Sequence, residues 1–166
     1  LYYPKEIEGE ISKLYEYLGK DNLEAIQRRL VEKAMPKGVC IMLYGKPGTG
    51  KTETVYQLAK KTGRAIFHVD IGNTISQWVG GTVNNLKQVF EKYEQLCEQL
   101  KSRGEEIPIL LFNEADALFG KRIEPPRGGC EIDENHTQSF LLDSIEKQEG
   151  IIIATTNLAG NFDEAF

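Results

Sequence analysis

The sequence has no apolar run approaching the roughly 18 residues that a membrane-spanning helix requires. Its three cysteines lie far apart, and no C-x-x-C pair suggests a metal or redox site. It also lacks an excess of positive charge, because the formal net charge is −5. The general electrostatic signature of nucleic-acid binding is therefore missing, although a local basic loop could still make a specific contact. We expect no membrane segment, and a cytoplasmic location, since unpaired cysteines are typical of reducing compartments.

The length and composition of the chain are typical of one globular domain. Apolar residues make up 40% and charged residues 27% of the 166 residues, which is enough to build a core. The chain opens without a Met and stops at Phe166, directly after LAGNFDEA, so we expect a fragment of a longer protein. We expect an N-terminal helical lead-in over residues 1–34 and an α/β subdomain over residues 35–166.

Short apolar runs alternate with helical patterns along the chain. The runs are continuous rather than alternating, which is typical of strands covered on both faces. The predicted strands are Val39–Tyr44, Ala65–Val69, Ile107–Phe112 and Ile151–Thr155, and helices are predicted over 11–18, 23–34, 52–61, from 86 to a stop at Gly104, and over 136–147. Strands that alternate with helices predict a parallel sheet between two helical layers, an α/β/α fold.

The stretch GKPGTGKT, residues 45–52, lies between a predicted strand and a predicted helix. It fits G-x-x-x-x-G-K-[ST], in which glycines let consecutive backbone amides point into one concavity that holds phosphate oxygens. The helix adds the positive end of its dipole. A plain glycine-rich turn is the alternative. The flanking elements favour a nucleoside triphosphate site, in which Lys51 contacts the β- and γ-phosphates and Thr52 binds Mg²⁺; its other residues are Pro47, Gly48, Thr49 and Gly50.

The third predicted strand runs into a polar pair, Asn113 followed by Glu114. Such a pair directs one side chain toward a metal shell and the next toward an attacking water, and Glu114 fits the role of general base. Asn113 keeps an acceptor oxygen but lacks the charge of an Asp. We therefore expect Mg²⁺ to bind more weakly, by ~1–2 kcal/mol. The alternative is that Glu114 and Asp116 only cap a helix over residues 115–119.

These stretches, together with IIIATTN at 151–157, resemble the AAA family of P-loop ATPases over roughly residues 23–166. GKPGTGKT resembles the Walker A loop, ILLFNEADALF the Walker B strand and IIIATTN the sensor-1 strand. The resemblance implies ATP and Mg²⁺ as ligands, with Thr52 and Asn113 at the metal. It implies catalytic roles for Lys51, Glu114 and Asn157. Asn157 would help position the water near the γ-phosphate; an ordinary Asn in a strand-to-loop turn is the alternative.

The segment QWVGG, residues 77–81, resembles the first pore loop of AAA protein remodellers. There an aromatic residue grips a polypeptide in the channel of a ring, a role that would fall to Trp78 and Val79. A buried Trp78 is the alternative. The family usually continues with Glu-Ser-Glu where this chain has Gly81-Thr82-Val83, and Thr82 is a candidate cap for the helix that follows. The segment 121–134 occupies the place of a second pore loop. Its basic residues Lys121, Arg122 and Arg127 could face a partner subunit or a substrate, or form a solvated loop.

The resemblance implies an ATP-hydrolysing module of a ring-forming protein remodeller, a hexameric homo-oligomer that cycles between ATP and ADP. In the family, arginines that reach a neighbouring subunit, a fifth strand and a helical lid follow the sensor-1 strand; we expect all three to be absent here and hydrolysis to be slow. Asn113 motivates a second hypothesis, a nucleotide-dependent switch or scaffold with little turnover. A third, a DNA loader or initiator, is disfavoured by the acidic balance.

Overall fold

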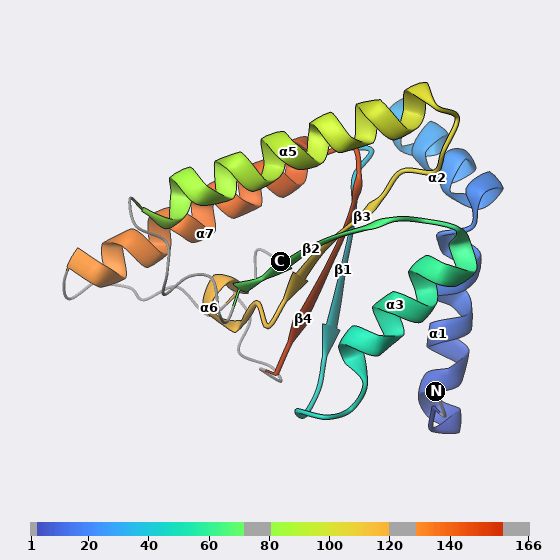
Figure 1. The fold of residues 1–166 in the computed structure, drawn as a ribbon, viewed down its shortest axis with the longest axis horizontal. Coiled ribbons are helices and arrows are strands. Elements are labelled where there is room, and N and C mark those ends of the chain that lie inside the picture. Colours follow the sequence, from blue (N-terminus) through green and yellow to red (C-terminus); the bar gives the residue numbers. More distant parts are fainter. Residues whose placement is uncertain (1–2, 72–80, 120–128, 158–166) are drawn as a thin grey trace.

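The computed structural model describes residues 3–71, 81–119 and 129–157. Figure 1 shows a sheet flanked by helices. The helices are α1 (Lys5–Tyr17), α2 (Lys20–Glu32), α3 (Lys51–Thr62), α5 (Thr82–Ser102), α6 (Asp116–Phe119) and α7 (Gly129–Lys147). The strands are β1 (Val39–Tyr44), β2 (Ile66–Asp70), β3 (Ile109–Asn113) and β4 (Ile151–Thr156).

All strand pairs that the structure describes are parallel, and the strand order is β1-β4-β3-β2. The predicted α/β fold with a parallel sheet is therefore confirmed. Parallel strands place their carboxyl ends at one edge of the sheet, where ligands of open α/β folds bind. The register brings Asn113 beside Asp70 and Tyr44 beside Thr156 at that edge.

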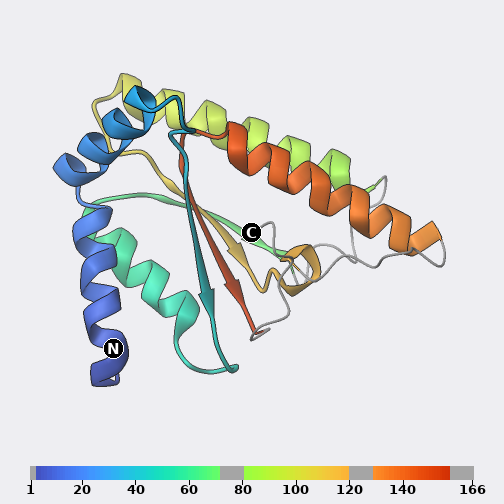
Figure 2. The ribbon, with the colours of Figure 1, turned by 180° about the vertical axis from the view of Figure 1, so that it is seen from behind.

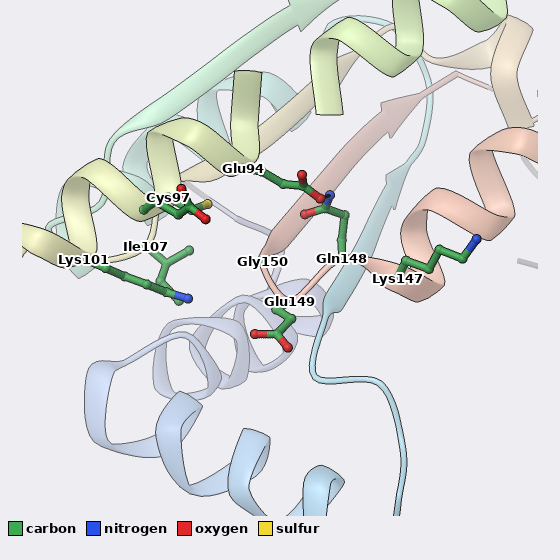
Figure 3. A pocket seen from close by; sticks show the side chains of 9 residues that line it. Glu94, Cys97, Lys101, Ile107, Lys147, Gln148, Glu149 and Gly150 are labelled. Atoms are coloured by element: carbon green, nitrogen blue, oxygen red, sulfur yellow. Dashed lines mark hydrogen bonds between the residues drawn. The ribbon is translucent and has the colours of Figure 1, made fainter. Parts of the chain in front are cut away.

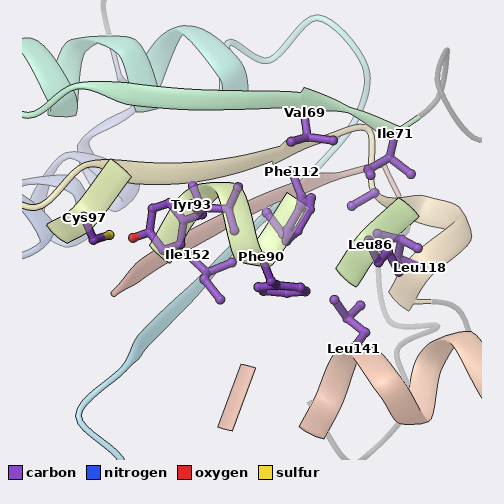
Figure 4. Packing of buried hydrophobic residues seen from close by; sticks show 13 residues of the cluster. Val69, Ile71, Leu86, Phe90, Tyr93, Cys97, Phe112, Leu118, Leu141 and Ile152 are labelled. Atoms are coloured by element: carbon purple, nitrogen blue, oxygen red, sulfur yellow. The ribbon is translucent and has the colours of Figure 1, made fainter. Parts of the chain in front are cut away.

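Side chains of β3 alternate between two cores. Leu110 and Phe112 pack with α5, α6 and α7 in one cluster, which Figure 4 shows around Phe90 and Tyr93. Ile109 and Leu111 pack with α3 in the other cluster, which also contains Leu18 and Leu23 from the N-terminal segment. Figures 1 and 2 show α5 beside α7 on one face of the sheet, and α1 beside α3 on the other. The three predicted layers follow from this alternation.

Several predicted boundaries are wrong in detail. β3 begins at Ile109 rather than Ile107, because Pro108 has no N–H to give to a ladder. α7 begins at Gly129 rather than about His136. Thr82 is the first residue of α5 and not its cap; Gly81 holds that position with a φ of 102°, and no side chain caps it.

Within the described ranges, no helix is both long and apolar enough to cross a membrane.

Candidate nucleotide-binding site

The predicted phosphate loop connects β1 to α3 at the carboxyl edge of the sheet. Gly48 and Gly50 have φ angles of 75° and 83°, a left-handed conformation that glycine adopts without steric cost. The hydroxyl of Thr49 donates to the carbonyl oxygen of Lys46 over 2.9 Å and closes the turn. α3 starts immediately afterwards, at Lys51. Its unpaired first amides and its dipole therefore favour an anion at this end.

The ammonium group of Lys51 is held against the loop. Its Nζ donates to the carbonyl oxygens of Gly45 and Lys46 over 2.8 and 3.0 Å, and to Oδ1 of Asn157 over 3.0 Å. An ammonium group has three hydrogens to donate, and these contacts match that number. The positive charge thus lies between the loop and the end of β4.

Asn113 joins α3 to β4 through a single oxygen. Its Oδ1 accepts from the hydroxyl of Thr52 over 2.6 Å and from the hydroxyl of Thr155 over 2.9 Å. The Thr52 hydroxyl therefore directs its hydrogen toward Asn113 and keeps its lone pairs for a cation. An amide oxygen gives this orientation as a carboxylate oxygen would, but without the negative charge.

Glu114 has a backbone conformation that is rare for residues other than glycine, with a φ of 53°. Two contacts with Thr155 hold it there: the N–H of Glu114 donates to the Thr155 hydroxyl over 3.2 Å, and the N–H of Ala115 donates to the Thr155 carbonyl over 2.9 Å. Non-glycine residues in this conformation are frequent at functional sites. The side chain of Glu114 is exposed and lines the pocket beside the loop.

Asn157 is bound to the carboxylate of Asp116. The backbone N–H of Asn157 donates to Oδ1 of Asp116 over 2.7 Å, and its Nδ2 lies 3.4 Å from Oδ2. The hydroxyl of Thr156 donates to the same Oδ1. The first residue of α6 is thereby tied to the carboxyl end of β4.

These residues surround a pocket of about 430 Å³, within the range of small-molecule sites. Its lining includes Pro47, Gly48, Gly50, Lys51, Thr52, Glu114 and Asn157, all predicted from the sequence, together with Glu53, Tyr56, Thr155 and Thr156, which are not among the predicted residues. Two predicted residues are not in the lining: Thr49 hydrogen-bonds within the phosphate loop, and Asn113 hydrogen-bonds to α3 and β4. The predicted pore-loop residues Trp78 and Val79 lie outside the described residues, as do Lys121, Arg122 and Arg127, so those predictions stay untested.

A smaller hollow of about 170 Å³ lies at the opposite end of the sheet, where Ile107 and Gly150 lead into β3 and β4. Figure 3 shows it between α5 and the end of α7, where Gln148 hydrogen-bonds Glu94 over 2.8 Å. Its charged residues have both signs, with Lys101 and Lys147 among glutamates. It is therefore separate from the phosphate loop, which lies at the carboxyl ends of the strands.

Two residues that organise the site are not assigned such a role from the sequence. Thr155 holds Asn113 and Glu114 together, and Asp116 holds Asn157. The sequence does contain one signal for Thr155, which is the run ATTN at the end of an otherwise apolar strand. Polar residues at the end of a buried strand need hydrogen-bond partners. Thr155 and Thr156 are each only 1% exposed.

The donor set fits a magnesium nucleotide. Loop amides and Lys51 suit phosphate oxygens, and the hydroxyl oxygen of Thr52, oriented by Asn113, is a hard oxygen ligand of the kind that Mg²⁺ prefers. The roles of individual residues in catalysis remain predictions.

Comparison with known proteins agrees with this geometry. Residues 41–166, more than half of the chain, match the model of the family "ATPase family associated with various cellular activities (AAA)". Among curated proteins, the chain is 32% identical over 133 residues to Protein CdcH of Halobacterium salinarum, which covers 78% of this chain and 16% of that protein. It is 31% identical over 131 residues to the ATPase family gene 2 protein of Schizosaccharomyces pombe, and this alignment covers 78% of this chain and 15% of that protein.

A third relative is the 26S proteasome regulatory subunit 7 homolog of Schizosaccharomyces pombe, 30% identical over 137 residues that cover 78% of this chain and 28% of the relative. The chain thus spans less than a third of the length of these three relatives. The extent of the family match, together with the phosphate loop and the strand-end residues, establishes that this chain belongs to the AAA family of ATPases.

Proposed function

We propose that this chain binds and hydrolyses ATP as the module of a ring-forming AAA ATPase that remodels proteins. The convergence of Lys51, Thr52 and Asn157 on one pocket, with Glu114 in its lining, carries the proposal. Side chains from α3, β4 and the end of β3 meet there although they are far apart in the sequence. A structural turn alone would not need this set of side chains.

Each residue has a distinct task in this proposal. The loop amides and Lys51 hold the β- and γ-phosphates, and Thr52, oriented by Asn113, offers its lone pairs to Mg²⁺. The metal, when bound, neutralises phosphate charge. Glu114 takes a proton from the attacking water, and Asn157 positions that water beside the γ-phosphate.

Binding is tested first, with a fluorescent ATP analogue and Mg²⁺. Lys51→Ala should weaken binding about tenfold or more, since it removes a charge-assisted phosphate contact. Glu114→Gln keeps the shape of the base and should bind as tightly as the parent protein. Equal affinity for the parent and the Lys51→Ala variant would contradict the proposed site.

Ring formation and action on polypeptides rest on family membership and on the resemblance of residues 77–81 to a pore loop. One relative is named as a proteasome regulatory subunit, which supports a protein substrate for that relative. Sedimentation of the full chain with and without ATP tests assembly. Stimulation of turnover by an unfolded polypeptide, lost in Trp78→Ala, tests remodelling.

A nucleotide-dependent switch with little turnover is the second candidate function, favoured by Asn113. The amide leaves the Mg²⁺ shell one negative charge short, which slows hydrolysis more than it weakens binding if the metal is needed mainly in the transition state. ATP binding without turnover in the assembled protein would select this candidate.

A further inference from the structure

We propose that Asp116 is a positioning residue of the nucleotide site, which acts through Asn157 to set how well the site distinguishes ATP from ADP. This inference rests on the proposed function. It concerns a residue that the proposed chemistry does not use, because Asp116 is not in the lining of the pocket.

The contacts of Asn157 specify which way its amide points. Lys51 is a donor only, so the atom it contacts at 3.0 Å must be the amide oxygen. The carboxylate of Asp116 is an acceptor, so the atom facing its Oδ2 at 3.4 Å must be the amide nitrogen. A cation on one side and an anion on the other therefore select the same orientation of one amide.

The main chain of Asn157 is fixed by the same carboxylate. Its N–H donates to Oδ1 of Asp116 over 2.7 Å, within the range for a charge-assisted bond. The buried hydroxyl of Thr156 donates to that oxygen as well and keeps the carboxylate from turning away. The stronger of the two Asn157 contacts is thus to the backbone, and the longer, side-chain contact is the one that can yield.

This arrangement matters for the γ-phosphate because Lys51 and Asn157 share one hydrogen bond. A γ-phosphate attracts the ammonium group of Lys51, and Oδ1 of Asn157 then loses its hydrogen-bond donor. The amide of Asn157 is no longer held on that side, so it can rotate and donate from Nδ2 to a phosphate oxygen. The anchored backbone keeps the side chain within reach during that rotation. ADP has no γ-phosphate, so it gains little from a well-placed Asn157.

The test compares the affinities for Mg-ATP and Mg-ADP in the full chain, with Glu114→Gln as the background so that ATP is not consumed. Asp116→Asn keeps the size of the side chain but removes its charge. We expect the ratio of the ADP and ATP dissociation constants to fall about tenfold, as for the loss of one charge-assisted contact. Asp143→Asn, at an exposed carboxylate paired with Lys147, is the matched control and should leave the ratio unchanged.

A double-mutant cycle separates action through Asn157 from a general effect on the site. Asn157→Ala should also lower the ratio, and Asp116→Asn should then produce no further change. An equal fall in the ratio in the presence and absence of the Asn157 side chain would overturn the proposal.

The coupling is also measurable without nucleotide. Asn157→Asp places a second carboxylate beside Asp116, while Lys51 can still pair with the new group. Adding Asp116→Asn removes the repulsion between the two carboxylates, so the double variant should melt at a higher temperature than the sum of the two single changes predicts. Purely additive changes in melting temperature would overturn the proposal. Failure of the parent protein to bind ATP would contradict the proposed function instead, and would leave this stability result to decide the role of Asp116.

Discussion

The hydroxyl of Thr52 donates a 2.6 Å hydrogen bond to the amide oxygen of Asn113, across 61 residues of sequence. The first helical turn after the phosphate loop is thereby fixed to the end of a central strand. A threonine hydroxyl held in this way has its oxygen free for a metal, and the Asn that holds it lacks only the charge of a carboxylate. In the proposed magnesium-nucleotide site, Asn113 therefore contributes an oriented oxygen but no negative charge.

Asn113→Asp should restore that contribution. We expect the Mg²⁺ concentration needed for ATP binding to fall about tenfold, as for a gain of ~1–2 kcal/mol. In EDTA the variant should melt at a lower temperature, because Asp70 is the register partner of residue 113 and like charges would face each other. Magnesium titrations and melting curves measure both effects. Gln95→Glu, at an exposed position on α5, controls for added charge. An identical response of the two variants would contradict the metal role of residue 113.

Glu114→Gly should stabilise the fold while it removes the proposed base. The φ of 53° at Glu114 costs a side-chain-bearing residue about 1 kcal/mol that glycine does not incur. Ala34 has a φ of 54° beyond the end of α2, so Ala34→Gly is the matched control. Urea unfolding should show a higher free energy of unfolding for both variants, with ATP turnover lost only in Glu114→Gly. A loss of stability specific to Glu114→Gly would show that the carboxylate, not the backbone, maintains this turn.

Gly150→Ala should destabilise the protein by roughly 1–3 kcal/mol, because a Cβ there would overlap the ring and hydroxyl of Tyr93. Tyr93 cannot move aside easily: it is fully buried, and its hydroxyl donates to the carbonyl of Pro108 and accepts from the N–H of Ile151, each over 2.8 Å. Burial raises the pKa of Tyr93, so the hydroxyl keeps its proton.

Gly9→Ala provides the contrast for that substitution. No atom lies within 4 Å of a Cβ at Gly9 in α1, so alanine should stabilise the helix by about 0.5–1 kcal/mol. Urea unfolding of the two variants should therefore give changes of opposite sign, and changes of the same sign would contradict the packing described around Tyr93.

Arg64→Met should cost about 3 kcal/mol, because it leaves buried acceptors without a donor. The Arg64 guanidinium donates to the carbonyls of Leu18 and Ile107 and pairs with Glu106 over 3.2 Å. Burial lowers the pKa of Arg64, and Glu106 acts in the opposite direction. Lys20 pairs with the same Glu106 from an exposed position, so Lys20→Met should cost under about 1 kcal/mol. Equal losses of stability for Arg64→Met and Lys20→Met in thermal unfolding would contradict the larger contribution assigned to the buried Arg64.

The sheet and its layers are predictable because the apolar runs are continuous and the glycines mark the loop. Val55, Leu58 and Ala59 on α3, and Leu86, Phe90 and Tyr93 on α5, are buried as their helical spacing predicts. Lys51, Thr52, Glu114 and Asn157 reach one pocket because strands that are parallel end at one edge.

The contacts that connect these residues are not predictable in the same way. Thr155 and Asp116 each make several hydrogen bonds that connect β3, β4 and α6. The spacing of apolar residues along the sequence does not identify such partners. Arg64 likewise appears in the sequence as one more surface charge, whereas tertiary packing buries it beneath the end of α1.

The most direct test of the central claim is phosphate release from Mg-ATP by the full-length protein, with Glu114→Gln as the blank and equal nucleotide binding verified for both. A working ATPase with Asn113 in its metal shell predicts release clearly above that blank. Release equal to the blank, with ATP still bound, would contradict hydrolysis and identify the protein as a nucleotide-dependent switch.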